Sequence, residues 1–314
     1  MTENEIYMQR CIQLAQHGLG RVAPNPMVGC VIVCDGKIIG EGFHIRYGEP
    51  HAEVNAINAI ENKALLKKSK LYVSLEPCSH HGKTPPCADL IIHENIPEVV
   101  IGIRDPFPMV SGRGIEKLKA AGIRVTTDIL SEACLELNKR FMTNHLKQRP
   151  YIILKWAQSS DGFIAPHKTG NFAISGNQAK LLVHQWRTEE QAIMIGTNTA
   201  MLDNPQLNVR LVSGNNPLRV VVDRNLKLPH HLNIFNQSSQ TVIINGIKNS
   251  EEGHITYHRI DFDSDIEQQV LYYLHSRQIS SVIIEGGSKF LHSFIEKNLW
   301  DEARIFIAKF KIND

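Results

Sequence analysis

The chain lacks any apolar stretch that approaches the roughly 20 residues needed to cross a bilayer. Its first five residues, Met1 to Glu5, are polar and acidic, unlike a secretory signal. Six cysteines in 314 residues are too sparse for the disulfide framework of a small secreted protein, and they indicate reduced thiols. These absences predict a cytoplasmic protein with no membrane partner.

An excess of charge of one sign is also missing. The 34 Lys and Arg residues nearly balance the 32 Asp and Glu residues, which leaves a net charge of +2. Proteins that bind nucleic acid present basic surfaces, and single strands are held by cations interleaved with aromatic rings. The sequence has no such run, so no nucleic-acid partner is expected. A local cluster of Lys and Arg would still suffice for one phosphate of a small substrate.

The length of the chain predicts two domains, because single hydrophobic cores rarely grow to 314 residues. The polar segment 146–150 ends in Pro150 and precedes a new strand pattern. We therefore expect one domain over residues 1–145 and a second over 146–314. The sequence contains no internal repeat, and it leaves open whether the protein forms a homo-oligomer.

Apolar patterning in each half alternates between helical and strand periods. In the first half it predicts helices over 6–18, 51–60, 87–93 and 112–120, and strands over 28–34, 37–43, 71–75, 99–103 and 123–127. Asp35-Gly36 predicts a hairpin turn between two of these strands. In the second half it predicts strands over 151–157, 192–196, 218–222, 241–244, 281–284 and 303–310, and helices over 175–187, 264–277 and 287–297. Ser175 and Gln178 match a capping box at the start of the first of these helices. The alternation predicts an α/β fold with largely parallel sheets.

The most informative motif is His51-Ala52-Glu53, followed by Pro77-Cys78 and Cys87. A catalytic zinc takes three protein ligands and keeps a fourth position open for water. One imidazole and two thiolates meet that need, and Glu53 is left over as a carboxylate. Zinc deaminases of nucleobases carry H-x-E and P-C-x-x-C, in which the Glu is the general acid/base. Here eight residues, not two, separate the cysteines. The alternative reading is a buried His with two ordinary reduced thiols.

Zinc lowers the pKa of a bound water to about 7, so a carboxylate must carry the proton from that water to the leaving amine. Glu53, at the start of a helix, is the candidate for this role. Glu76 is also near in sequence, but a strand-end carboxylate is expected to have a structural, hydrogen-bonding role. His80, His81 and Lys83 in the spacer are either a phosphate clamp or solvated loop charges. In the second half, Gly286-Gly287 between a strand and a helix could approach a phosphate, or could simply turn the chain.

Three segments together resemble one family, the bifunctional deaminase–reductase of bacterial riboflavin biosynthesis. They are Pro24-Asn25-Pro26-Met27-Val28-Gly29, Gly48-Glu49-Pro50-His51-Ala52-Glu53 and Leu75-Glu76-Pro77-Cys78-Ser79-His80-His81-Gly82-Lys83-Thr84-Pro85-Pro86-Cys87. The long spacer between the cysteines is this family's own form. The similarity continues through Ser160-Asp161-Gly162, Asp203-Asn204-Pro205 and Glu285-Gly286-Gly287, so it covers nearly the whole chain.

The resemblance implies a cytidine-deaminase-like N-terminal domain and a C-terminal domain similar to dihydrofolate reductase. The first would use Zn2+ to remove the 2-amino group of 2,5-diamino-6-(5-phosphoribosylamino)pyrimidin-4-one by hydrolysis. The second would use NADPH to reduce the ribosyl group to ribityl. Members of the family continue beyond the position of Asp314, which implies a reductase domain that is C-terminally shortened and has an unpaired sheet edge.

The family's functional residues map onto this sequence position by position. His51, Cys78 and Cys87 would bind zinc, and Glu53 would transfer protons. The substrate would be contacted by Asn25, His44, His80 and Lys83 in the deaminase, and by Lys155, Asn171, Arg187, Leu207, Arg210 and Glu285 in the reductase. NADPH would be contacted by Ala157, Ala173, Thr199, Asp203, Arg224, Gly287, Ser288, Lys289, Phe290, Leu291, His292 and Ser293. Asn171 and Ala173 depart from the family, which more often has Ser and Trp there.

Two other classes of function compete with this reading. In the first, the protein edits nucleic acid and its C-terminal half holds RNA; the near-neutral charge opposes that. In the second, zinc only holds the fold, which predicts a closed site with Glu53 or a spacer His as fourth ligand.

Overall fold

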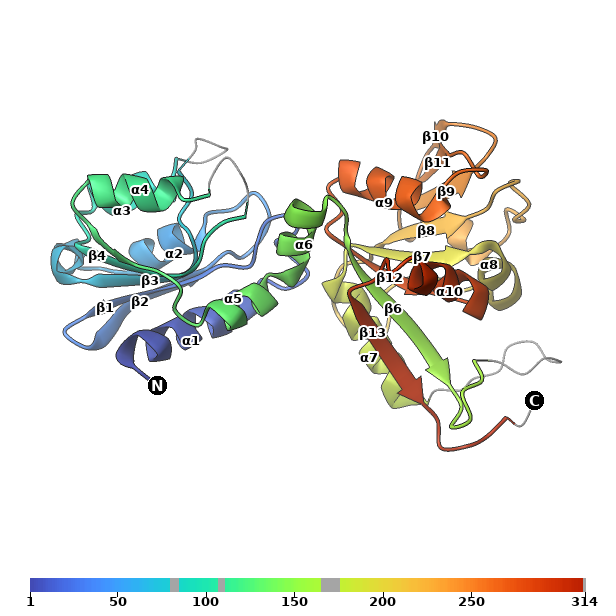
Figure 1. The fold of residues 1–314 in the computed structure, drawn as a ribbon, viewed down its shortest axis with the longest axis horizontal. Helices are drawn as coiled ribbons and strands as arrows, with labels where there is room; N and C mark the ends of the chain where they lie inside the picture. Colours follow the sequence, from blue (N-terminus) through green and yellow to red (C-terminus); the bar gives the residue numbers. More distant parts are fainter. Residues whose placement is uncertain (80–84, 107–110, 165–175, 313–314) are drawn as a thin grey trace. The chain divides into compact units, whose positions relative to one another are not determined.

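The computed structural model describes residues 1–79, 85–106, 111–164 and 176–312. The chain forms two compact units, Met1–Lys147 and Gln148–Asp314, and each is built on one β-sheet (Figure 1). Within the described residues, no helix combines the length and apolar character that a bilayer crossing requires.

The sheet of the N-terminal unit has the strand order β2-β1-β3-β4-β5. Strand β1 pairs antiparallel with β2 and β3, whereas β3, β4 and β5 run parallel. Asp35 and Gly36 both adopt positive φ, 50° and 71°, as a two-residue hairpin turn demands, so the predicted turn is confirmed. The strands are β1 (Gly29–Cys34), β2 (Lys37–Phe43), β3 (Lys70–Leu75), β4 (Glu98–Ile103) and β5 (Arg124–Thr126).

Helices cover both faces of this sheet, and for this reason the residues of β1 are buried throughout. On one face α2 (Ala52–Asn58), α3 (Cys87–His93) and α4 (Arg113–Ala120) share a hydrophobic cluster with the strands. On the other face α1 (Glu3–Gln16), α5 (Ser131–Leu137) and α6 (Lys139–Lys147) do so. A 3-10 helix, η1 (Lys63–Lys68), precedes β3. Helices α5 and α6 are additions to the elements predicted from sequence.

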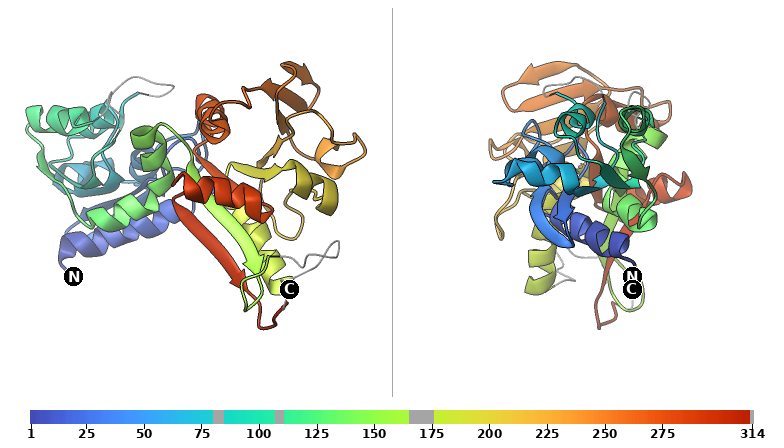
Figure 2. Two further views of the ribbon diagram at one scale, coloured as in Figure 1. Left: turned by 45° about the vertical axis from the view of Figure 1, so that its right-hand side comes forward. Right: turned by 90° about the vertical axis from the view of Figure 1, so that its left-hand side faces the viewer.

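The C-terminal unit has an eight-stranded sheet of order β10-β11-β9-β8-β7-β12-β6-β13. Every neighbouring pair is parallel except β10 and β11, so the predicted α/β fold with a parallel core is confirmed. The edge strand β13 lies beside β6 (Figure 2). The strands are β6 (Tyr151–Gln158), β7 (Ala192–Gly196), β8 (Leu218–Val222), β9 (Thr241–Asn245), β10 (Ser250–Glu252), β11 (Ile255–Arg259), β12 (Ser281–Glu285) and β13 (Glu302–Ile307).

Helices α9 (Ile266–Ser276) and α10 (Ser288–Glu296) pack on one face of this sheet, and α7 (Asn177–Glu189) and α8 (Thr197–Asp203) pack on the other. A short 3-10 helix, η2 (Asn233–Phe235), joins the second face. The helix predicted to open at Ser175 begins two residues later, because α7 starts at Asn177 and its N-cap residue is Gly176. Ser175 itself lies outside the described residues.

Candidate functional site

The structure brings together the three residues predicted as zinc ligands. His51 is the N-cap residue of α2, Cys87 is the first residue of α3, and Cys78 follows the end of β3. One nitrogen of His51 and the two sulfur atoms lie within 4.8 Å of one another. The segments that follow β2 and β3 therefore bring all three donors to the carboxyl end of β3.

The separations of these donors fit a tetrahedral zinc ion. The Nδ1 atom of His51 lies 3.6 Å from the sulfur of Cys78 and 3.3 Å from that of Cys87. Zinc binds sulfur at about 2.3 Å and nitrogen at about 2.1 Å, which places tetrahedral N and S donors about 3.6 Å apart. The donor set and its spacing thus suit zinc with one position left over.

Local hydrogen bonds favour the thiolate form of Cys78. The Cys87 thiol and then His51 hydrogen bond to it, and in spite of its burial they hold the pKa of the Cys78 thiol below its usual value. The backbone N–H of Cys87, at the N-terminus of α3, also donates to the Cys78 sulfur over 3.2 Å. Unpaired N–H groups and the positive end of a helix stabilise a thiolate in this way.

Glu53 lies in the first turn of α2 and is 3% exposed. Burial, and then the nearby Cys78 sulfur, raise the pKa of its carboxyl group to about 7. A group that takes and returns protons at neutral pH works best with a pKa in that range. Among the described residues the cluster of donor atoms consists of His51, Cys78 and Cys87, without Glu53. Glu53 is therefore next to the donors without belonging to the cluster that could hold a metal.

Asn25 and His44, predicted to line the pyrimidine pocket, meet beside His51. The ring of His44 packs edge-on against that of His51, with centroids 5.5 Å apart. Its Nδ1 lies 3.1 Å from the carbonyl oxygen of Pro50, and its Nε2 lies 3.2 Å from Nδ2 of Asn25. Burial lowers the pKa of His44, so the neutral ring donates from Nδ1 and accepts from Asn25. The other two residues predicted for this pocket, His80 and Lys83, lie outside the described residues.

Glu76 has the structural role that the sequence predicts. Its buried carboxylate accepts four backbone N–H groups: Oε2 from Asp105 and Gly112, and Oε1 from Gly114 and Ile115, over 2.9–3.3 Å. It thereby caps α4, whose own N-cap residue is a glycine. A side chain at Gly114 would meet the carbonyl oxygen of Pro77 at 2.1 Å, so only glycine allows this approach. These four hydrogen bonds fix the backbone at Glu76, two residues before Cys78.

In the C-terminal unit, the predicted site residues gather at the carboxyl ends of neighbouring parallel strands, where ligands of open α/β sheets bind. Lys155 and Ala157 lie on β6, Glu285 ends β12, and Thr199 follows β7. Arg224 comes just after β8, and Asp203 ends α8. Asn171 and Ala173 lie outside the described residues. The sheet order places β8, β7, β12 and β6 side by side, so Lys155, Glu285, Thr199 and Arg224 lie towards the same end of the sheet.

Glu285 is the anionic centre of this edge. It stands opposite Lys155 in the register of β12 and β6, and its Oε2 lies 3.7 Å from the Lys155 ammonium group. Arg187 of α7 approaches the same oxygen to 3.2 Å. Although burial opposes it, these two cations keep the pKa of Glu285 below its usual value. The three side chains form a largely buried group with two positive charges and one negative charge.

Several of the residues predicted to bind NADPH, Thr199 and residues 287–293, lie at or near the start of α10. Gly287 is its N-cap residue, and the N–H of Gly287 donates to Oγ1 of Thr199 over 3.1 Å. Gly287, Ser288 and Lys289 are exposed, and Gly286 has φ of 143°, which favours glycine. A helix start of this kind suits a phosphate. Of the later residues, Phe290 and Ser293 are half-buried, His292 is exposed, and Leu291 is in the core.

For Leu207 and His184 in the C-terminal unit, the structure shows surroundings that the sequence did not predict. The side chain of Leu207 is 2% exposed and packs in the core, so any contact with substrate would involve its main chain. His184, which the sequence reasoning missed, is buried beside Arg187 and Arg210. A single His on a partly apolar helix gives no sequence signal that separates it from a core residue.

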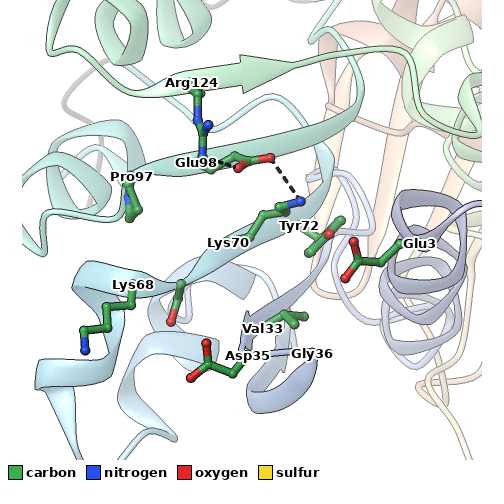
Figure 3. A pocket seen from close by; sticks show the side chains of 11 residues that line it. Glu3, Val33, Asp35, Gly36, Lys68, Lys70, Tyr72, Pro97, Glu98 and Arg124 are labelled. Carbon is green, nitrogen blue, oxygen red and sulfur yellow. Dashed lines mark hydrogen bonds and ion pairs between the residues drawn. The ribbon is translucent and has the colours of Figure 1, made fainter.

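A separate hollow lies at the other end of the N-terminal sheet, where β3 and β4 begin (Figure 3). Its central charged side chains are paired within the protein, because Glu98 pairs with Lys70 over 3.1 Å and with Arg124 over 2.8 Å. A strand of six residues spans about 17–20 Å, so the hollow is remote from Cys78. It contains none of the donor residues described above.

Two protein-family models match the chain. The cytidine and deoxycytidylate deaminase zinc-binding region matches residues 1–103, and the RibD C-terminal domain matches residues 150–310. The riboflavin biosynthesis protein RibD of Aquifex aeolicus is 37% identical over 307 residues, which cover 96% of this chain and 86% of that protein. RibD of Escherichia coli is 37% identical over 324 residues, with coverage of 98% and 88%.

Solved structures agree with these matches. A Thermotoga maritima protein described as a diaminohydroxyphosphoribosylaminopyrimidine deaminase/5-amino-6-(5-phosphoribosylamino)uracil reductase is 40% identical, with a TM-score of 0.91. The aligned region covers 99% of this chain and 88% of that one. RibD of Acinetobacter baumannii is 33% identical, with the same TM-score and the same coverage.

Proposed function

The chain belongs to the RibD family of bifunctional riboflavin-biosynthesis enzymes, and from that premise we propose that its two units act in turn on one phosphorylated pyrimidine. The protein combines a zinc-dependent deaminase with an NADPH-dependent reductase. We assign to it the substrate 2,5-diamino-6-(5-phosphoribosylamino)pyrimidin-4-one, a member of the compound class named for the Thermotoga maritima relative. A cytoplasmic location stays a prediction.

The observation that carries the deaminase half is a cluster of three donors with Glu53 outside it. His51, Cys78 and Cys87 would hold zinc, since their separations fit its bond lengths. Zinc held there would lower the pKa of a bound water and so supply the nucleophile for the ring carbon that bears the amine. Glu53 takes the proton of the attacking water and delivers it to the nitrogen, which leaves as ammonia.

Asn25 and His44 are assigned to the pyrimidine ring. Because neutral His44 accepts from the Asn25 amide N–H, the carbonyl oxygen of Asn25 is directed to accept from a ring N–H or amino group. This arrangement selects a ring by its hydrogen-bonding edge. His80 and Lys83 keep their proposed role towards the phosphate.

Replacement of Cys78 by Ser should remove zinc and deamination together, because a hydroxyl group replaces the thiolate that completes the donor set. Zinc per chain and ammonia release are measured on the same sample, and NADPH-dependent reduction of pre-deaminated substrate should persist. Cys34→Ser, in β1, is the matched control and should keep both zinc and rate. A Cys78→Ser protein that retains one zinc and its rate would remove Cys78 from the site.

In the reductase, NADPH supplies the hydride when it is bound, and the chain supplies orientation and charge. The start of α10, with Gly287 and Thr199, is assigned to a phosphate of the cofactor. Arg224, exposed after β8, suits the 2′-phosphate that distinguishes NADPH from NADH. We assign to Lys155 the donation of a proton to the sugar oxygen during reduction, and its pairing with Glu285 over 3.7 Å supports this role.

Substitution of Lys155 by Met should lower the rate constant of reduction by about two to four orders of magnitude, because a positioned acid is lost and Glu285 loses a counter-charge. NADPH oxidation with pre-deaminated substrate measures this, and ammonia release in the same protein should be unchanged. Lys180→Met, at an exposed position of α7, is the control. A normal rate of reduction in the Lys155 variant would rule out this role.

A further inference from the structure

His184 is a buried titratable side chain beside the reductase site that the reaction described above leaves unused. It lies on α7, one turn before Arg187, and is 3% exposed. Burial, and then the cations of Arg187 and Arg210, lower the pKa of His184 to about 4. Its ring is therefore neutral at physiological pH and can accept a hydrogen bond.

His184 hydrogen-bonds to the segment 208–210, which has no regular secondary structure. Three consecutive residues of this segment have a main-chain group bound by a side chain. The carbonyl oxygen of Asn208 accepts from Nη1 of Arg187 over 3.3 Å, and the N–H of Val209 donates to Oδ1 of Asn216 over 2.7 Å. The N–H of Arg210 donates to Nδ1 of His184 over 3.2 Å.

Helix α7 thus hydrogen-bonds to the segment through two side chains. Positions 184 and 187 are three residues apart and lie on the same face of the helix. His184 accepts a hydrogen bond from the segment, and Arg187 donates one to it. The hydrogen bond to His184 fixes the main chain of Arg210. The side chain of Arg210 is bound as well, because Oδ1 of Asn208 accepts from its Nη1 over 3.0 Å. An exposed arginine is in this way held in one place without burial of its charge.

We propose that His184 is a positioning residue that fixes the main chain at Arg210, and thereby the guanidinium that binds the phosphate of the reductase substrate. The inference rests on the proposed function, because it takes Arg210 as a substrate contact. Arginine suits a phosphate because its planar fork binds two oxygen atoms at once. His184 acts through Arg210 and touches no reacting atom.

The test compares three variants of the full chain in steady-state reduction of pre-deaminated substrate. His184→Leu removes the acceptor, His184→Gln places its oxygen near the position of Nε2, and His184→Asn places an oxygen near that of Nδ1. We expect KM to rise about tenfold or more in the Leu and Gln variants, with kcat within about threefold. In His184→Asn, KM should stay within about threefold of wild type. If the Leu variant does not fold, the Gln variant carries the same prediction.

Substrate without its phosphate isolates the group that Arg210 binds. With that substrate, wild type and His184→Leu should have the same KM, whereas an equal rise with both substrates would overturn the proposal. Unchanged KM in the Leu and Gln variants, or a rise in the Asn variant as large as theirs, would also overturn it. Ammonia release by each variant reports that the deaminase unit is intact. Absence of reduction by wild type would instead refute the proposed function.

Discussion

Replacement of Glu53 by Gln should slow ammonia release by about two to four orders of magnitude while the protein keeps its zinc. The amide has nearly the same shape but cannot take a proton from water. Glu53 is buried next to the donor atoms and is not one of them, so the metal site should survive the change. Ammonia release and zinc per chain, measured on one preparation, give the result.

The matched control is Glu61→Gln, the same change at an exposed position beyond α2, which should leave both measurements unchanged. NADPH-dependent reduction of pre-deaminated substrate should also be normal in Glu53→Gln, because the reductase residues lie in the other unit. Loss of zinc would make Glu53 a fourth ligand and the site structural. Loss of both activities in a folded, zinc-loaded protein would contradict the independence of the two units.

Replacement of Glu76 by Ala should lower the free energy of unfolding of the N-terminal unit by about 3–5 kcal/mol, because four buried N–H groups lose their acceptor. The strand end that leads to Cys78 should loosen with it, so zinc affinity should fall as well. Denaturant unfolding, followed by a probe in this unit, and competition for zinc with a chelator measure the two effects.

Glu116→Ala provides the comparison for Glu76, since it removes an exposed carboxylate from the first turn of the same helix. It should change neither stability nor zinc affinity appreciably. If Glu76→Ala were as stable as Glu116→Ala, the four hydrogen bonds would not hold this part of the fold.

Elements with strong local signals could be predicted from the sequence. Asp35-Gly36 specifies its hairpin turn because both positions need positive φ, and the fully apolar β1 reads directly as a buried strand. Helix α8 could not be predicted, because Thr197, Asn198 and Thr199 are weak helix formers that tertiary packing overrides. Helices α5 and α6 did have a usable signal in their Leu, Glu and Lys residues, which the sequence reasoning passed over.

In the candidate site too, residues with a local sequence signal could be predicted, and those that depend on tertiary contacts could not. His51, Cys78 and Cys87 belong to one motif, and their residue types alone suggest that they meet at a metal. The hydrogen-bonding role of Glu76 also followed from its place at a strand end. The pairing of Lys155 with Glu285 did not, because it depends on the order of strands in the sheet and on the register of β6 against β12. Similarly, the role of His184 could not be predicted, because it depends on the segment 208–210 that folds against α7.

The central claim is that one chain carries out deamination at the His51 cluster and then reduction at the edge marked by Glu285. Mass analysis of products tests it most directly, with zinc-loaded protein and the diaminopyrimidine phosphoriboside, with and without NADPH. Without NADPH the product should have one amino group replaced by oxygen and an intact ribosyl group. With NADPH that product should gain two hydrogen atoms and become the ribityl compound. Unchanged diamino substrate under both conditions, or reduction without deamination, would contradict the account.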